Sequence, residues 1–192
     1  GIGCSGYTQN VYKCDIAITT GNLSACTTTG QLQIGTPTDG LGTAAGSAGL
    51  GAMAGTVYAN YIYLIGGLAD GIADLRTTRY AKFDDSNNVV TVGTGWVETV
   101  LADGNLTNTG RRRGSGFGYN GYLYVAGGYD ATHGVLADIE FAKLDVSDGS
   151  IGSWRVSSVS IDQRWGLTIS VSNSYAFVIG GCVDGNSPTC NA

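Results

Sequence analysis

Short apolar runs with an aromatic residue at every second position recur along the chain, and each run ends in a double glycine. The runs are YIYLIGG at residues 61–67, YLYVAGG at 122–128 and YAFVIGG at 175–181. Aromatic side chains two residues apart lie on one face of a β-strand. The first glycines are residues 66, 127 and 180, so the motif returns after 61 and then after 53 residues. The pattern predicts an array of similar β units.

Further strands flank each run in the same order. A strand is predicted before each run, at residues 51–58, 113–119 and 165–172, and a two-residue turn joins the two strands. The turns are Ala59-Asn60, Asn120-Gly121 and Asn173-Ser174. Asn-Gly at this spacing is a strong hairpin signal, because both turn residues must accept a positive φ. After the double glycine come a polar loop, a third strand (78–83 or 138–144) and a fourth, tryptophan-bearing strand (95–98 or 153–156). Four antiparallel strands make one blade of a β-propeller.

The N-terminal segment fits the second half of the same unit. Residues 11–16 align with 139–144, and residues 21–26 align with 149–154. We therefore divide the single segment 1–192 into the last two strands of a blade (1–35), two full blades (51–98 and 113–157) and the first two strands of another blade (165–192). The predicted fold is an all-β propeller with about three blade equivalents and split blades at both ends.

These residues resemble the kelch family, and more closely the bacterial kelch-like propellers whose blades read YAKL and then DGSIGSW. The chain has YAKF at residues 80–83, FAKL at 141–144 and DGSIGSW at 148–154. The resemblance implies radial blades around a central channel, closed by strands from the two chain ends. The N-terminal unit departs from the family pattern, because cysteines stand there in place of Ala and Trp.

The number of blades is too small for a closed ring. Propellers normally have at least four blades, and each split blade exposes an unpaired strand edge. We favour a piece of a longer protein with about six to eight blades, and a start at Gly1 rather than Met agrees with a processed product or a fragment. Alternatively, two copies close a six-bladed ring as a homo-oligomer. Pairing of the two half-blades within one chain is least favoured, because it needs a three-bladed ring.

Composition excludes some partners and supports many short strands. Charged residues make up 13% of the chain, well below the average of about 25%, and 32 residues are glycine. The net charge is −5 and the pI is about 4.6, so we expect no nucleic-acid partner. The charge-free stretch 40–69 is interpreted as a loose linker and a hairpin instead of a membrane span, because it lacks about 20 predominantly apolar residues.

Five cysteines in this weakly charged chain favour an oxidising, extracellular or cell-surface location. In the repeat alignment Cys14 replaces Ala142 and Cys26 replaces Trp154, on adjacent third and fourth strands. A Cys14–Cys26 disulfide would substitute for the packing of the missing tryptophan. Cys182 and Cys190 flank a polar loop and are expected to pair, which leaves Cys4 without a partner and suggests further sequence upstream. A zinc site is not expected, since no Cys-x-x-Cys pair occurs.

Arginines form the one dense charge cluster of the sequence. Arg111, Arg112 and Arg113 stand where a first strand begins, and Arg164 has nearly the same place in the next unit. In a propeller this position lies near one rim of the channel, so the arginines are candidates for a ring that binds carboxylates or other anions. The alternative is that they are solubilising residues that flank a glycine-rich strand and pair with nearby Asp.

Catalytic motifs and cofactor motifs are not evident. His133, the only histidine, stands in the loop after the second double glycine, and we expect it to be solvated. Two glycine-rich matches to the dinucleotide fingerprint, at 1–6 and 116–121, precede strands where the fingerprint needs a helix, so no cofactor is expected. The turn at 145–154 resembles the Asp box of sialidase propellers with a different spacing, and we interpret it as a turn stabiliser.

The expected function is that of a non-enzymatic binding or scaffold module that recognises protein or glycan through the loops after each double glycine. These loops cover residues 68–76, 129–136 and 182–191, and their candidate ligand-binding residues are Asp70, Asp130, His133 and Asp184. One alternative is a polysaccharide hydrolase or lyase with these acids and the arginines at the channel mouth. It requires two carboxylates and an arginine in one cleft. Another is a structural subunit that assembles by blade complementation.

Overall fold

Every regular element that the structure describes is a β-strand. The computed structural model describes residues 10–23, 26–31, 50–69, 74–83, 96–99, 106–107 and 110–183. Within these ranges the strands form several antiparallel sheets, and no helix is found. The predicted all-β class is confirmed.

Two four-stranded antiparallel sheets form the centre of the body. Sheet 1 has the order β4–β5–β7–β8 and sheet 2 the order β9–β10–β13–β14. The strands of sheet 1 are β4 (Ala54–Tyr58), β5 (Tyr61–Ile65), β7 (Thr78–Lys82) and β8 (Trp96–Glu98). Those of sheet 2 are β9 (Ser115–Tyr119), β10 (Tyr122–Ala126), β13 (Ile139–Lys143) and β14 (Arg155–Val156). Each strand falls within a predicted strand segment, in the predicted order.

Two further sheets have only two strands each. Sheet 3 pairs β15 (Thr168–Ser172) with β16 (Tyr175–Ile179), and the N-terminal hairpin pairs β1 (Asn10–Lys13) with β2 (Thr27–Gln31). Short ladders join β3 (Leu50–Gly51) to β6 (Leu68–Ala69) and β11 (Tyr129–Asp130) to β12 (Gly134–Val135). The alignment of 11–16 with 139–144 and of 21–26 with 149–154 holds in the structure, since residues 16 and 23 meet in an isolated bridge as residues 144 and 151 do.

The backbone of the unit is repeated closely from sheet to sheet. The three hairpin turns have positive φ at both residues, for example 48° at Asn120 and 77° at Gly121, as a type I′ turn requires. Register repeats as well, since Tyr58 opposes Tyr61, Tyr119 opposes Tyr122 and Ser172 opposes Tyr175. The offset of 61 residues therefore relates the first three strands of sheets 1 and 2, and the offset of 53 relates the β9–β10 hairpin to the β15–β16 hairpin.

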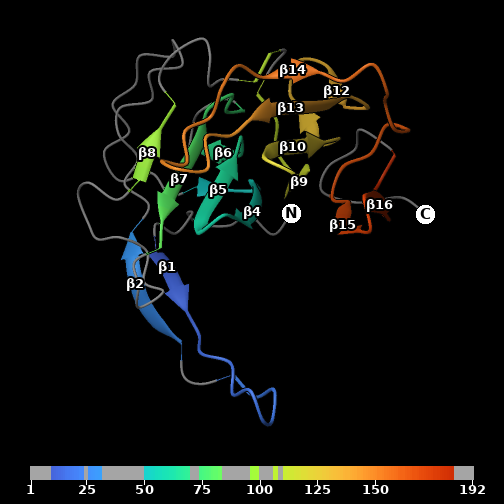
Figure 1. The fold of residues 1–192 in the computed structure, drawn as a ribbon. Coiled ribbons are helices and arrows are strands. Elements are labelled where there is room, and N and C mark those ends of the chain that lie inside the picture. The colour runs from blue at the N-terminus through green and yellow to red at the C-terminus, as the bar shows by residue number, and fades with distance from the viewer. Residues whose placement is uncertain are drawn as a thin grey trace.

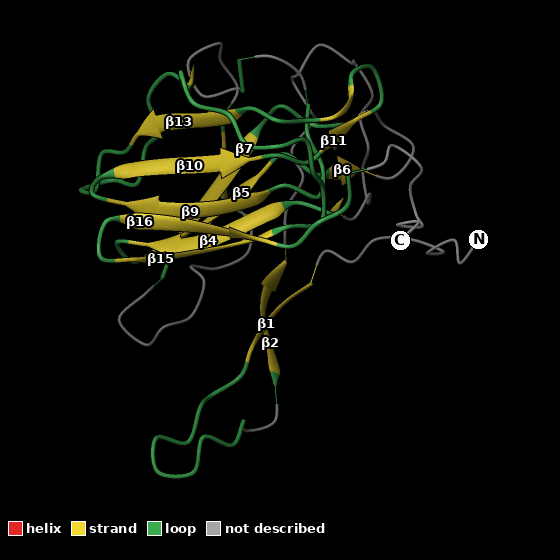
Figure 2. Cartoon of the chain, turned by 90° about the vertical axis from the view of Figure 1, so that its right-hand side faces the viewer, coloured by secondary structure: helices red, strands yellow, loops and turns green. Residues whose placement is uncertain are grey.

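The sheets fan out from their first strands. Strand β4 lies beside β9, and β9 lies beside β15, while the later strands of each sheet lie farther out (Figure 1). Figure 2 shows the body from the side, with the N-terminal hairpin projecting away from it. This arrangement is blade-like, but within the described ranges the sheets do not close into a ring, and β1–β2 and β15–β16 are separate sheets.

The main hydrophobic core lies between sheets 1 and 2. Sheet 1 contributes Tyr61, Tyr63 and Ile65 from β5, and sheet 2 contributes residues from both its inner and outer strands. The latter are Leu123, Val125, Ala142, Leu144 and Trp154. Burial raises the pKa of the Tyr63 hydroxyl, and the neighbouring Tyr61 adds to the effect. The core is therefore a contact between adjacent sheets and does not lie within one sheet.

The double glycines bring the backbones of adjacent sheets together. The amide of Gly67 donates a hydrogen bond to the Arg111 carbonyl oxygen at 2.7 Å, and Gly128 donates to the Arg164 carbonyl oxygen at 2.8 Å. A Cβ atom on Gly127 would lie 2.6 Å from the Arg164 oxygen, and Gly127 has a φ of 57°. Only glycine fits this combination of close approach and left-handed backbone.

The turn between β13 and β14 contacts the aromatic face of sheet 1, since the hydroxyls of Tyr61 and Tyr63 donate hydrogen bonds to its carbonyl oxygens. Asp145 accepts hydrogen bonds from the side chain and amide of Ser147, and Asp148 accepts one from the Ser150 amide. The bonds from Ser147 lower the pKa of the Asp145 carboxyl. These contacts agree with the interpretation of this segment as a stabilised turn.

The predicted disulfide between Cys14 and Cys26 is present, and it joins the two arms of the N-terminal hairpin. Cys182 is also disulfide-bonded. Cys190, its predicted partner, lies outside the described residues, as does Cys4. The second half of the charge-free stretch 40–69 forms the β4–β5 hairpin, as predicted. In the part of the chain that the structure describes, no helix is long and apolar enough to span a membrane.

Candidate functional site

The predicted arginine cluster and the loop after the second double glycine lie at the same edge of the sheets. Arg112 forms a β-bridge with Tyr129, and Trp165 forms the equivalent bridge with Cys182 in the next unit. Strands β11 and β12 then form a short hairpin. We call this region the double-glycine edge and define it as residues 112–113, 129–136 and 164–165. It is the candidate ligand-binding site.

Arg112 connects two of the loops. Its guanidinium donates a hydrogen bond to Oδ1 of Asp74 at 2.6 Å and lies over the Tyr129 ring, 4.6 Å from the centroid. The second oxygen of Asp74 accepts the amide of Ala131 at 2.8 Å. The cation–π contact and the ion pair hold the loop of sheet 1 against the hairpin of sheet 2.

Asp130 shapes the tip of the β11–β12 hairpin. Its buried carboxylate accepts hydrogen bonds from the amides of Thr132 and His133, at 2.6 and 3.0 Å, and lies 2.8 Å from Nδ1 of His133. The imidazole itself is exposed, as expected, but it is held in a fixed orientation by a buried acid. The hairpin therefore presents residues 131–133 to solvent on an ordered backbone.

Arg113 and Arg164 lie at the same edge with different contacts. The Arg113 guanidinium lies 4.7 Å from the centroid of the Trp165 ring. Arg164 donates hydrogen bonds to the carbonyl oxygens of Asp162, at 3.1 Å, and Gly180, at 3.2 Å. Its ion pair with the Asp162 carboxylate is long, at 3.4 Å. Whether these cations bind an anion stays a prediction.

Arg111 lies in the interior and not on the edge surface. Its guanidinium forms ion pairs with Asp138, at 2.7 Å, and with Glu140, and it donates to the Gly127 carbonyl oxygen at 2.9 Å. Glu140 is fully buried and also accepts the amide and hydroxyl of Thr107, at 2.6 and 2.8 Å. The cluster connects β13, a central strand of sheet 2, to the segment that precedes β9, which is a structural role.

The structure brings two carboxylates and an arginine together, but not in a cleft. Both Arg111 and Glu140 are buried, and neither lines a described pocket. Among the residues that the structure describes, no group of three or more His, Cys, Asp or Glu side chains is placed to hold a metal ion. Among the described residues of the double-glycine edge, two carboxylates and an arginine do not converge in an open cleft, and Asp70 and Asp184 lie outside these residues.

Some predicted site residues cannot be placed, and some residues of the site were not predicted. Asp70 and Asp184 lie outside the described residues. Asp74, Tyr129 and Trp165 contact the predicted arginines but were not singled out from the sequence. The signal for the two aromatic residues was available, since each stands at a repeated bridge position beside an arginine.

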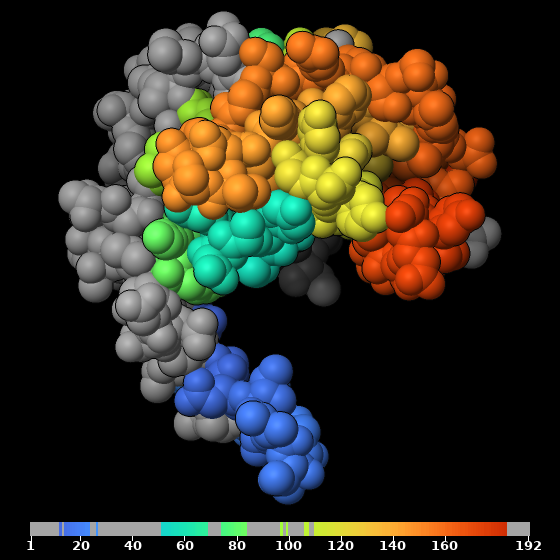
Figure 3. Space-filling view, viewed as in Figure 1, coloured from blue at the N-terminus to red at the C-terminus, as the bar shows by residue number. Residues whose placement is uncertain are grey.

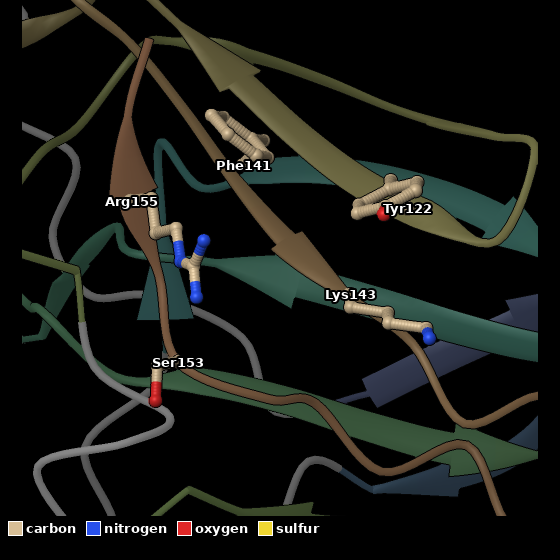
Figure 4. A pocket seen from close by; sticks show the side chains of 5 residues that line it. All are labelled: Tyr122, Phe141, Lys143, Ser153 and Arg155. Carbon is tan, nitrogen blue, oxygen red and sulfur yellow. The ribbon is translucent and has the colours of Figure 1, made fainter.

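A second concave site lies on the outer part of sheet 2. This pocket has a volume of about 220 Å³, and Figure 4 shows its five side chains around one space. They are Tyr122, Phe141, Lys143, Ser153 and Arg155. Two aromatic rings and two cationic side chains therefore share one open face. Sequence reasoning did not identify this pocket, because its residues come from three separate strand segments.

Comparison with known proteins gives no family for this chain. No family model matches it, and a search of curated proteins finds no related sequence.

Proposed function

We propose that this chain is a non-enzymatic binding module, built on a kelch-like propeller scaffold, that recognises a partner through its double-glycine edge. The observation that carries the proposal is the contrast between constant backbone and variable side chains. The same β-bridge after the double glycine involves Leu68, Tyr129 or Cys182 in the three units. A scaffold that repeats its geometry while its loops differ is suited to presenting a recognition surface.

The chemistry of the edge favours a protein partner over a glycan. The exposed tip of the β11–β12 hairpin consists of Ala131, Thr132 and His133, which offer hydrogen-bonding groups on an ordered backbone. Glycan sites commonly use an exposed aromatic ring with a polar handle. One face of the Tyr129 ring is occupied by Arg112, so the described part of the edge offers no such platform.

The proposed location is extracellular or at the cell surface. The Cys14–Cys26 disulfide and the disulfide of Cys182 support it, because disulfides persist in oxidising compartments.

The test is a parallel screen of the 192-residue protein against an array of surface proteins and a glycan array. We expect a protein partner whose binding weakens at least about tenfold in a Thr132→Ala/His133→Ala variant, the loss of about 1.4 kcal/mol of contacts. Val146→Ser, in an exposed turn, is the matched control and is expected to bind normally. Absence of a protein partner, or binding insensitive to the hairpin change, would overturn the proposal.

The polysaccharide hydrolase or lyase is the second candidate. Its specific requirement is a cleft with two carboxylates and an arginine, and the one such cluster described is buried. Assays of the same protein on acidic and neutral polysaccharides test it directly.

A further inference from the structure

The N-terminal hairpin has the backbone of the half that sheet 3 lacks. In sheet 2, Glu140 opposes Val156 and Phe141 opposes Arg155. In the hairpin, Tyr12 opposes Thr28 and Lys13 opposes Thr27, which are the same pairs shifted by 128 positions. The isolated bridge that follows also repeats, as 144 with 151 and as 16 with 23. The hairpin is therefore equivalent to β13–β14, and no described strand pairs with it in the place of β9–β10.

Residues that are buried in the full sheets are exposed in the two half-sheets. Tyr175 is 69% exposed, whereas its equivalent Tyr61 is 5% exposed. Ile16 in the hairpin is 66% exposed, whereas its equivalent Leu144 is 5% exposed and lies in the core. Further exposed apolar residues at such positions are Phe177 and Ile179, which correspond to the buried Tyr63 and Ile65. Both half-sheets therefore lack a partner of the kind that the full sheets have.

The pocket on sheet 2 is the place where such a partner belongs. In sheet 1, the aromatic cluster Tyr61, Tyr63 and Tyr80 is covered by the outer half of sheet 2, including Ala142, Leu144 and Trp154. The equivalent cluster of sheet 2 is Tyr122, Tyr124 and Phe141, with ring centroids 6.1 to 6.3 Å apart. Two of these rings line the open pocket of Figure 4. Within the described residues, sheet 3 consists of β15 and β16 alone, with no outer half that covers these rings.

The backbone contact that the double glycine makes with the next unit is also open at sheet 3. A Cβ atom on Gly66 or Gly127 would collide with the carbonyl oxygen of the next unit, whereas a Cβ atom on Gly180 would meet nothing within 4 Å. The residue equivalent to Arg111 and Arg164 in the first unit is Leu50, which starts β3. The first unit therefore carries the backbone position that would follow sheet 3.

We propose that a second copy of this chain supplies its β1–β2 hairpin to complete sheet 3. Strand β1 of the second copy adds to the free edge of β16, with Tyr12 opposite Val178, as Glu140 lies opposite Val125 within sheet 2. The Cys14–Cys26 disulfide and Ile16 of the second copy then cover the pocket on sheet 2, where Ala142, Trp154 and Leu144 cover sheet 1. Leu50 of the second copy meets Gly180.

Of the rings that can be built from these 192 residues alone, the one made of two copies fits a propeller and the one made of a single copy does not. Joining the two half-sheets of one chain would close a ring of three sheets, fewer than the four to eight that propellers use. Two chains that exchange hairpins close a ring of six, which lies within that range. Figure 3 shows the hairpin, in blue, standing away from the body, and sheet 3, in red, on the other side of the body. The hairpin and sheet 3 correspond to complementary halves of one four-stranded sheet. Each copy therefore carries the half that the other copy needs, which favours a second copy as the occupant.

Sedimentation and light scattering of the 192-residue protein test the proposal with a matched pair of variants. Ile16→Asp places a charge at a position that the second copy buries, so we expect the dimer to dissociate at least about a hundredfold more readily. Ile18→Asp is the control, because Ile18 is 99% exposed and its equivalent Val146 remains 54% exposed in a full sheet. The control is expected to dimerise normally.

A mixing experiment identifies which surfaces meet. Ile179→Asp changes sheet 3, the surface that receives the hairpin, at a position equivalent to the buried Ile65. A ring of two copies has two junctions, each between the hairpin of one copy and sheet 3 of the other. When both copies carry the same substitution, both junctions are changed, so each variant alone is expected to be monomeric. A mixture of the Ile16→Asp and Ile179→Asp proteins has one intact junction, so we expect it to form a dimer that neither protein forms alone. Near-ultraviolet circular dichroism, which reports the buried Trp154 and Trp165, confirms that each variant is folded.

Several outcomes would overturn the proposal. These are a monomeric wild-type chain at tens of micromolar, equal effects of Ile16→Asp and Ile18→Asp, and a mixture that stays monomeric. A monomer whose hairpin amides are protected from hydrogen exchange would indicate pairing within one chain and would also overturn it. The partner screen on monomeric Ile16→Asp protein is independent of these results, since the double-glycine edge lies elsewhere.

Discussion

The hydroxyl of Tyr63 donates a hydrogen bond to the carbonyl oxygen of Gly149, 86 residues along the chain, at 3.1 Å. Tyr63 lies on the second strand of sheet 1, and Gly149 lies in the outer turn of sheet 2. The bond shows how adjacent sheets recognise one another. The outer turn of one sheet covers the aromatic side chains of the sheet before it.

Replacing Tyr63 by Phe removes this bond and keeps the ring. We expect a loss of about 1 kcal/mol in the free energy of unfolding, the usual net value of a buried hydrogen bond. Urea denaturation followed by tryptophan fluorescence measures it. Tyr175→Phe, at a side chain that is 69% exposed, is the control when both changes are measured in the Ile16→Asp background, and a loss as large as that of Tyr63→Phe would contradict the argument.

Alkaline pH is expected to destabilise the protein through the same residue. Burial raises the pKa of Tyr63 above its ordinary value of 10.0, so the folded state keeps a proton that the unfolded state releases. The stabilising contribution is complete below pH 10 and is lost as the pH rises through the folded-state pKa. Urea midpoints from pH 8 to 11 should fall above pH 10, and the fall should be smaller in Tyr63→Phe.

Glu140→Gln is expected to cost about 3 kcal/mol, because it leaves the buried Arg111 with one carboxylate partner in place of two. Asp162→Asn is the matched control at an exposed ion pair, and we expect a change within about 0.5 kcal/mol. Thermal unfolding compares the two. Similar losses in both variants would mean that the buried cluster contributes no more than a surface pair.

Gly127→Ala and Gly180→Ala separate backbone strain from close packing. Both residues have positive φ, which costs an alanine about 1–2 kcal/mol. Only at Gly127 would the methyl group also collide with a carbonyl oxygen of the next unit. Measured in the Ile16→Asp background, where the end at Gly180 is open, Gly127→Ala should be clearly the more destabilising of the two. Equal losses would show that close approach is unimportant.

Removing the Cys14–Cys26 disulfide should affect the hairpin and spare the sheets. A Cys14→Ser/Cys26→Ser protein loses a constraint worth about 3 kcal/mol on the chain-entropy model. Hydrogen exchange in β1 and β2 is expected to accelerate, while exchange in β5 and β10 stays slow in the monomeric Ile16→Asp background. Faster exchange throughout the body would contradict this prediction.

The strands of this fold were predictable because their signals are local. Alternating aromatic residues, two-residue turns and double glycines each act over a few positions, and the strands of sheets 1 and 2 fall where these signals place them. The Cys14–Cys26 disulfide followed from the repeat alignment. The same alignment places the strand equivalent to 153–156 at residues 25–28, where β2 begins.

The site was less predictable because its contacts are not local. Arg111 and Arg112 are neighbours in sequence, yet one is buried against Glu140 and the other lies over Tyr129. Adjacent residues at the entrance to a strand point to opposite sides, so one sequence cluster serves two purposes. The open pocket at Tyr122 was missed for a related reason, since a pocket left by an incomplete neighbour has no sequence signature of its own.

The double-glycine contact has a consequence for how such chains are kept apart in the cell. The amide of Gly67 or Gly128 recognises a main-chain oxygen, which every residue type possesses. A unit can therefore be duplicated or exchanged during evolution without rewriting the junction. The same tolerance means that a unit cannot distinguish its own successor from one on another molecule. Identity must then come from the order of synthesis and from local concentration.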